Sequence, residues 1–258
     1  EQDLLSVLRQ LKALGYDGVE FAGFYGHSAQ DVRAMLEECD LRAVSSHVAL
    51  KLIEADMQGV IDYHKAIGCD YIAVPYLSAE QRPGTPAFAG VLRTIYQFGC
   101  LCRDNGIQLL YHNHDFEFVS FSGMYALDFL YAAMPEDVLK TEIDVCWVKY
   151  AGEDPAAYLR KYAGRAPVVH LKDFVGRKEG DAAPYGLLGQ SETKAAGEVP
   201  FEFRPVGYGC QDVSAVAEAG LDAGAKWFVV EQDASVGRTP LEAAAMSIDT
   251  LRKIGLKG

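Results

Sequence analysis

The sequence is short of positive charge. It has 24 Lys and Arg residues against 36 Asp and Glu residues, which gives a formal net charge of −12. Nucleic acids and anionic membranes are bound through basic surfaces, so this balance argues against both as partners. The acidic excess favours solubility, and part of it could hold a cation.

The sequence also lacks the signals for secretion, membrane insertion and thiol chemistry. Its apolar runs are too short to span a membrane, and the first residues, EQDLLSVLRQLKALG, have neither the basic flank nor the cleavage site of a signal peptide. None of its six cysteines forms a CxxC pair, which argues against a zinc knuckle or a redox motif. We therefore expect reduced, mostly buried thiols in a cytoplasmic protein.

What the sequence does contain is an internal repeat. Four segments follow the same order of a helix end, a glycine and an apolar strand: LKALGYDGVEFAG, HKAIGCDYIAVPY, CRDNGIQLLYHNH and LDAGAKWFVVEQD. Glycine closes a helix at little steric cost because it adopts the left-handed conformation, and the predicted caps are Gly15, Gly68, Gly106 and Gly224. The strands are continuous apolar runs, as expected of parallel strands buried on both faces. The pattern predicts strands near residues 18–23, 42–48, 71–76, 107–114, 140–146, 167–173 and 227–232.

Strands and helices that alternate along one chain leave two architectures, a doubly wound sheet and a (β/α)8 barrel. The GxGxxG fingerprint of dinucleotide-binding sheets follows none of the predicted strands. Polar residues end nearly every strand instead, as the active-site rim of a barrel requires: Glu20, His47, His114, Asp144, Asp173 and Glu231. We therefore predict that residues 1–258 form a single (β/α)8 TIM barrel domain.

Two features depart from the repeat. Seven strands are found rather than eight, and the sequence opens on a helix. The missing strand is predicted to be the first, before Glu1, and the alternative is an incomplete barrel. The stretch 175–200 is polar and rich in glycine, and it has two interpretations, a lid over the site and a disordered loop.

Residues two apart in a strand face the same side of the sheet. Four successive strands therefore each present a pair near their carboxyl ends: His112 with His114, Glu142 with Asp144, His170 with Lys172, and Glu231 with Asp233. Any one of these residues alone is best interpreted as a hydrogen-bonded core or capping group. Eight such groups on one rim need a cation or a substrate, because unpaired buried charge is costly. Imidazole nitrogen together with carboxylate oxygen suits Mn, Co, Zn or Mg, and the imidazoles favour the first three.

The chain resembles the sugar phosphate isomerase/epimerase family of the xylose isomerase-like TIM barrels. The matching motifs cover nearly the full length in the family's order: GYDGVEFAG, SSHV, YHNHDFEF, EIDVCWV, VVHLKDF, PVGYG and VVEQD. The resemblance implies a divalent metal ion held by His112, Asp144, His170 and Glu231. Two positions depart from the family's pattern. Many relatives have Glu in place of His112, and a His often stands where this chain has Trp147.

The resemblance implies a divalent-metal-dependent sugar isomerase or epimerase that removes a proton next to a carbonyl group and forms an enediolate. The base is predicted to be Glu231, or His114 if that residue is not a ligand. Lys172 would donate a proton or hold an enolate oxygen, and its alternative is an ion pair with Asp173 or Glu142.

The substrate implied by the resemblance is a small sugar or keto-sugar. Glu20 and His47 are expected to contact its hydroxyl groups. Arg204 is expected to hold a phosphate or hydroxyl group, with an exposed salt-bridge residue as the alternative. Barrels of this family often pair, so a homo-oligomer is compatible with the resemblance.

The main alternative function is a lyase or dehydratase that acts on a keto-sugar, an inosose or an oxidised glycoside. Epimerases of the family use carboxylates from the fifth and eighth strands on opposite faces of the substrate. Here Glu231 alone remains of that pair, unless Glu142 substitutes for the other. Two further alternatives are a phosphodiesterase like endonuclease IV, against which the net charge argues, and a binding protein without turnover.

Overall fold

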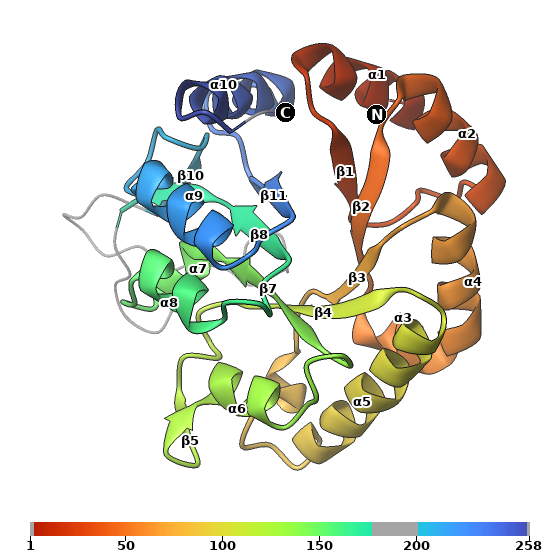
Figure 1. The fold of residues 1–258 in the computed structure, drawn as a ribbon, viewed down its shortest axis with the longest axis vertical. Coiled ribbons are helices and arrows are strands. Elements are labelled where there is room, and N and C mark those ends of the chain that lie inside the picture. Colours follow the sequence, from red (N-terminus) through yellow and green to blue (C-terminus); the bar gives the residue numbers. More distant parts are fainter. Residues whose placement is uncertain (1–2, 177–200, 257–258) are drawn as a thin grey trace.

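The computed structural model describes residues 3–176 and 201–256. Seven parallel strands form one sheet that is nearly closed into a barrel, in the order β1-β2-β3-β4-β7-β8-β11 (Figure 1). Each strand lies inside one of the seven predicted segments, so the predicted strands and the barrel are confirmed. The strands are β1 (Gly18–Phe21), β2 (Arg42–His47), β3 (Tyr71–Val74), β4 (Gln108–His112), β7 (Lys140–Asp144), β8 (Val168–Leu171) and β11 (Trp227–Val230).

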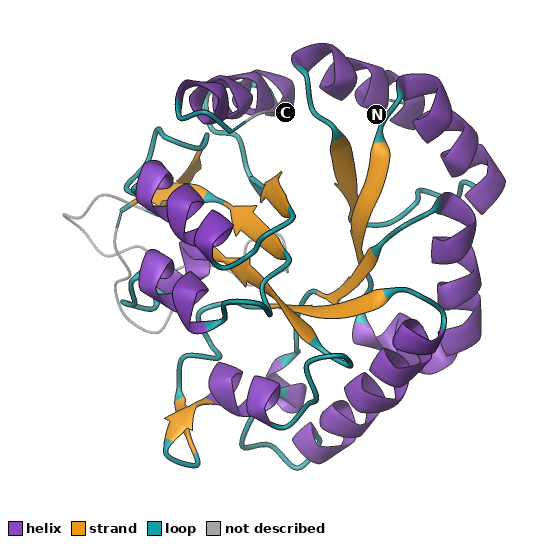
Figure 2. Cartoon of the chain, viewed as in Figure 1, coloured by secondary structure: helices purple, strands orange, loops and turns teal. Residues whose placement is uncertain are grey.

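Helices surround the sheet on its outer side (Figure 2). The helices are α1 (Leu4–Leu14), α2 (Ala29–Cys39), α3 (Leu50–Ala55), α4 (Met57–Ile67), η1 (Ala79–Gln81), α5 (Phe88–Asp104), α6 (Ala126–Ala132), α7 (Val145–Tyr150), α8 (Pro155–Lys161), α9 (Val213–Asp222) and α10 (Pro240–Lys253). The four predicted glycine caps all have left-handed backbone angles, with φ of 95° at Gly15 and 71° at Gly68, for example. The predicted order of helix, glycine and strand is therefore confirmed. At each of these glycines the chain turns from the helix into the next strand.

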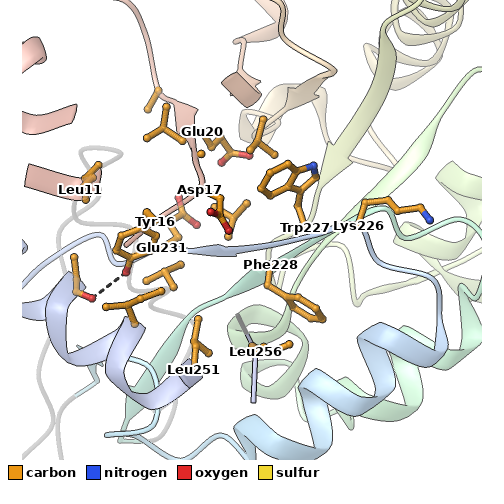
Figure 3. A pocket seen from close by; sticks show the side chains of 18 of the residues that line it. Leu11, Tyr16, Asp17, Glu20, Lys226, Trp227, Phe228, Glu231, Leu251 and Leu256 are labelled. Carbon is orange, nitrogen blue, oxygen red and sulfur yellow. Dashed lines mark hydrogen bonds between the residues drawn. The ribbon is translucent and has the colours of Figure 1, made fainter. Parts of the chain in front are cut away.

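The barrel is open between β1 and β11, which each pair with a single strand among the described residues. A cleft of about 550 Å³ separates them, and α1 and α10 close it from outside through Leu11 and Ile248 (Figure 3). No strand precedes β1 in the described part of the chain, as the sequence predicted. That a strand before Glu1 completes the barrel remains a prediction.

Two short antiparallel pairs lie outside the main sheet. They are β5 (Ser120–Phe121) with β6 (Met124–Tyr125), and β9 (Asp173–Val175) with β10 (Glu202–Arg204). The polar stretch predicted at 175–200 lies outside the described residues from residue 177 onward. Its interpretation as a lid is therefore a prediction that the structure does not address.

An apolar layer fills the middle of the barrel. Leu110 of β4, Val168 of β8 and Ala73 of β3 are fully buried there and pack with Val229 of β11. Because side chains two apart share a face, the next inward residue on three of these strands lies one layer closer to the carboxyl ends. Those residues are His112, His170 and Glu231, so the apolar layer is the floor on which the polar site rests.

Candidate metal centre

The polar residues at the strand ends converge above that floor. His112, Glu142, Asp144 and His170 are between 0% and 2% exposed, and Lys172 is 2% exposed. The curvature of the sheet turns the inward faces of β4, β7, β8 and β11 toward one point, which explains why residues distant in sequence meet. Two groups of side chains lie close enough to hold a metal ion, and they share His112 and His170.

The first group, which we call the outer set, consists of His112, Asp144, His170 and Glu231. These are the four ligands that the resemblance implied, one from each of four strands. His170 Nδ1 lies 3.0 Å from Glu231 Oε2, and His112 Nε2 lies 3.8 Å from Asp144 Oδ2. Asp144 Oδ2 is buried without a hydrogen bond. Two imidazoles and two carboxylates in this arrangement fit a divalent cation, because their donor atoms all lie within 4.8 Å of one another.

The second group places His47 and Glu142 against the same two histidine rings, and these two residues together with Glu20 form what we call the inner set. Glu142 Oε2 lies 2.8 Å from His47 Nε2, 3.4 Å from His112 Nδ1 and 3.5 Å from His170 Nε2. Glu20 Oε1 lies 3.1 Å from His47 Nε2 and 3.0 Å from His170 Nε2. The sequence predicted that Glu20 and His47 contact substrate hydroxyl groups. The structure pairs them with protein groups, and both also line the cleft, so their contact with a substrate stays a prediction.

Lys172 is the cation that borders the outer set. Its Nζ lies 2.8 Å from Asp233 Oδ1, 2.9 Å from Glu231 Oε2 and 3.5 Å from Asp144 Oδ2. The predicted alternative, an ion pair with Asp173 or Glu142, differs from these contacts, because Lys172 pairs with three other carboxylates. The ammonium also lies 5.3 Å from the ring centres of Trp147 and Phe203, which form an aromatic wall beside it.

Asp173 has a structural role. Its carboxylate accepts four backbone N–H groups, from Phe174 (2.9 Å), Gly207 (3.0 Å), Gly209 (2.9 Å) and Gln211 (3.1 Å). The PVGYG motif is thus held against the end of β8. A side chain at Gly209 would collide with Asp173 Oδ1, since an added Cβ would lie 2.2 Å from it.

The charge states follow from burial and from these neighbours. Burial lowers the pKa of Lys172, but Glu231, Asp144 and Asp233 raise it well above its usual value, so Lys172 is an ammonium ion. Burial raises the pKa of Glu231, but Lys172 and His170 lower it well below its usual value, so Glu231 is a carboxylate. Burial, with the added effect of Glu231, raises the pKa of Asp144 to about 7 against the opposing effect of Lys172. A cation beside Asp144 would relieve that penalty.

The histidines divide into neutral and charged rings. Burial lowers the pKa of His112 to about 3 and outweighs the effect of Glu142, whose Oε2 lies 3.4 Å from Nδ1, so this ring is neutral, as a metal ligand must be. Burial lowers the pKa of His47 and His170, but Glu20 and Glu142 reverse that effect. The pKa of His47 rises to about 9, and that of His170 rises well above its usual value. A metal ion that binds His170 must displace its proton.

His114 lies next to the outer set but is not one of its four residues. Its ring centre is 5.1 Å from that of His112, and the ring stacks on Trp147 at 5.2 Å and on Phe116 at 5.5 Å. Burial lowers the pKa of His114 well below its usual value, and the nearby His112 and Lys172 add to this effect. A neutral imidazole in that position is able to accept a proton.

Two supporting residues in the motif YHNHDFEF were not predicted. Asn113 Oδ1 accepts the backbone N–H of Asp144 at 3.0 Å, and its Nδ2 donates to the backbone carbonyl of Asp144 at 3.3 Å. Glu117 is fully buried and accepts the hydroxyl of Tyr111 (2.7 Å) and the backbone N–H of His114 (2.9 Å). The available signal was the polar character of Asn113 between two inward-facing histidines on a buried strand.

Two other predictions concern residues near the site. Arg204 lies at the end of β10, where its guanidinium pairs with Glu202 at 3.1 Å, and its proposed contact with a phosphate stays a prediction. All six cysteines are free thiols, and four of them are buried. Cys146 packs with Trp147, Phe174 and Phe203, as expected of a packing residue.

Comparisons with known proteins agree with this fold. The profile of the xylose isomerase-like TIM barrel family matches residues 8–254. No curated protein matches the sequence. Within the described residues, no helix has both the length and the apolar character needed to cross a membrane.

Solved structures with the same fold include three from different bacteria. A sugar phosphate isomerase/epimerase from Parabacteroides distasonis has a TM-score of 0.78 and 20% identity over 100% of this chain and 90% of that one. A xylose isomerase-like TIM barrel protein from Mycobacterium smegmatis in complex with magnesium has a TM-score of 0.68 and 16% identity over 98% and 88%. The probable 3-DHS dehydratase AsbF from Bacillus anthracis, involved in petrobactin synthesis, has a TM-score of 0.73 and 12% identity over 98% and 94%.

Proposed function

The chain belongs to the xylose isomerase-like TIM barrel family, and from that premise we propose that it is a divalent-metal-dependent enzyme that removes a proton beside the carbonyl group of a sugar or keto-sugar. The observation that carries the proposal is the outer set with Lys172 against it. Four donor side chains meet there, one carboxylate oxygen lacks a hydrogen bond, and a buried ammonium adjoins them.

The donor set fits a metal ion of the Mn, Co, Zn or Mg group. His112 and His170 supply imidazole nitrogen, and Asp144 and Glu231 supply carboxylate oxygen. A bound divalent cation supplies a Lewis acid that polarises the carbonyl and stabilises the negative charge of an enediolate. The buried position of Asp144 Oδ2 supports a cation there, because a buried carboxylate oxygen without a hydrogen bond is costly.

Three residues are candidates for the proton transfers: Glu231, His114 and Lys172. Lys172 and His170 hold Glu231 as a carboxylate, which suits it to be a ligand of the metal ion. His114 is neutral and lies beside the four ligands without being one of them, so we assign the base to His114. Lys172 is a buried ammonium and would donate a proton, or a hydrogen bond, to the oxygen on which negative charge develops.

Two outcomes are open to a substrate that has lost this proton. Its return to carbon gives an isomerase or epimerase, which is the first candidate because the family profile and the Parabacteroides distasonis structure support it. Loss of a group from the next carbon gives a lyase or dehydratase. The second candidate is favoured by one observation. Glu142 faces the inner set, so it does not replace the second carboxylate that proton return on the opposite face would use.

The test begins with elemental analysis of the purified protein. Ketoses and keto-cyclitols are then incubated in deuterium oxide with the metal found. Deuterium uptake with an unchanged carbon skeleton indicates isomerisation or epimerisation, and loss of water or of an aglycone indicates a lyase. Protein that binds no divalent ion, or that exchanges no proton of any substrate, would refute the proposed function.

A further inference from the structure

Each of the two histidines of the outer set has one ring nitrogen that faces the outer set and one that faces the inner set. His112 turns Nε2 toward Asp144 and Nδ1 toward Glu142. His170 turns Nδ1 toward Glu231 and Nε2 toward both Glu142 and Glu20. Each ring is therefore sandwiched between a carboxylate of the outer set and a carboxylate of the inner set.

A neutral imidazole that binds a metal ion through one nitrogen carries its proton on the other. A carboxylate that accepts this proton fixes both the tautomer and the direction of the ring. The inner set is placed to do so for both ligands. Its carboxylates are buried, with Glu142 fully so, and Ser45 Oγ donates to the remaining oxygen of Glu142 at 3.4 Å.

The geometry points to Glu142 and Glu20 as positioning residues of the proposed metal centre. We propose that Glu142 accepts Nδ1–H of His112, that Glu142 and Glu20 together accept Nε2–H of His170, and that the metal ion is bound by His112 Nε2 and His170 Nδ1. The inference rests on the proposed function, because it assigns a role toward the same metal ion. It replaces the expectation that Glu20 binds substrate and that Glu142 serves as a base.

His47 completes the inner set. Its Nε2 lies between the two carboxylates, 2.8 Å from Glu142 and 3.1 Å from Glu20. No Lys or Arg of residues 3–176 and 201–256 forms an ion pair with either carboxylate, so their charge is balanced by imidazole protons. His47 thus holds the two carboxyl groups together at the distance at which both reach His170.

A metal ion in the inner set is the competing arrangement. It would use His112 Nδ1 and His170 Nε2, and the rings could not then serve the outer set without losing their last protons. The two positions are therefore alternatives. The outer position is favoured because its group offers two carboxylates to a divalent ion, whereas the inner group offers one, Glu142, whose Oε2 already lies 2.8 Å from His47 Nε2.

The test measures Zn²⁺ affinity, by competition with a chelator, and histidine tautomers, by ¹⁵N NMR of the zinc-loaded protein. The unmodified protein should show His112 protonated at Nδ1 and His170 protonated at Nε2. Glu142→Ala should weaken Zn²⁺ binding about 10–100-fold and abolish the protected Nδ1–H signal of His112. Glu142→Gln should recover part of the affinity, because an amide oxygen still accepts an N–H. Glu20→Gln should affect the signal of His170 and leave that of His112.

Glu117→Gln is the matched control, because Glu117 is another fully buried carboxylate but accepts from Tyr111 and from the backbone of His114. It should keep the affinity and both tautomers. If Glu142→Ala does not fold, Glu142→Gln and Glu20→Gln decide the matter by their Zn²⁺ affinity and by the ¹⁵N shifts of the ring N–H groups, which should change where an amide replaces the accepting carboxylate. Unchanged tautomers and affinity in the Glu142 variants would overturn the inference, as would anomalous scattering from a metal ion bound by His47 and Glu142. Failure of the unmodified protein to bind any divalent ion would instead refute the proposed function.

Discussion

Lys172 Nζ lies 2.9 Å from Glu231 Oε2, so the protein's own ammonium shares a carboxylate with the candidate metal site. The same carboxylate oxygen accepts from His170 Nδ1 at 3.0 Å. Glu231 therefore connects the ligand set to the group that we assign as the acid. Lys172 adds positive charge to the site but no atom that binds a metal ion. Metal binding and proton donation can therefore be tested by separate substitutions.

Replacing the ligand and replacing the acid should have different effects. His170→Ala should lose the metal ion and activity together, because one of four ligands is removed. Lys172→Met keeps all four ligands and most of the side-chain volume, so it should bind metal at full stoichiometry while kcat falls about 10²–10⁴-fold. Metal content by elemental analysis and steady-state kinetics measure both. Full metal stoichiometry in His170→Ala would refute the ligand assignment, and unchanged turnover in Lys172→Met would leave Lys172 with a structural role only.

Glu117 should make stability depend on pH. Burial raises its pKa from 4.5 to about 7 in spite of hydrogen bonds from Tyr111 and His114. The folded state then binds more protons than the unfolded state between these values, so the free energy of unfolding falls as pH rises from 4.5 to about 7, by about 3 kcal/mol. Glu117→Gln does not titrate and should lose this part of the pH dependence. Urea unfolding of both proteins at several pH values measures it, and parallel curves for the two would contradict the prediction.

Two glycines in α5 offer a matched pair for packing. A Cβ at Gly99 would lie 2.5 Å from the carbonyl oxygen of Val138 and 2.6 Å from its Cγ1, whereas a Cβ at Gly90 meets nothing within 4 Å. Gly99→Ala should lower the free energy of unfolding by about 1–3 kcal/mol, because the helix and the segment before β7 must separate. Gly90→Ala should raise it by roughly 0.5–1 kcal/mol through its higher helix propensity. Thermal unfolding measures both, and equal effects would show that the close approach at Gly99 is unimportant.

Asp173 should be needed for the loop that holds the PVGYG motif. Asp173→Ala leaves four backbone N–H groups without their acceptor and should lower the free energy of unfolding by about 3 kcal/mol or more. Asp212→Ala removes a carboxylate that accepts one N–H, from Ala215 at the start of α9, and should cost about 1 kcal/mol. Hydrogen exchange at Gly207 and Gly209 should accelerate in Asp173→Ala and stay slow in Asp212→Ala. Slow exchange in both would show that another contact holds the loop.

The sequence by itself determined the strands, the helix ends and the residues at the strand ends. These depend on local physics. Gly15 and Gly68 end their helices because glycine adopts the left-handed conformation easily, and buried parallel strands are continuous apolar runs. A side-chain period of two then placed His112, Asp144, His170 and Glu231 on the inward face of their strands, where the structure brings them together.

Only the tertiary structure decided how these residues divide among roles. Glu142 and Asp144 face the same way, but two residues of strand separate them by roughly 6–7 Å along the barrel, so Asp144 joins the outer set and Glu142 the inner set. The partners of Lys172 and the two sides of each histidine ring depend on strand register and on the curvature of the barrel, which join segments from 26 to 150 residues apart. Local periodicity fixes the face on which a side chain lies. The depth of that side chain and its neighbours across the barrel are set by how the strands are assembled.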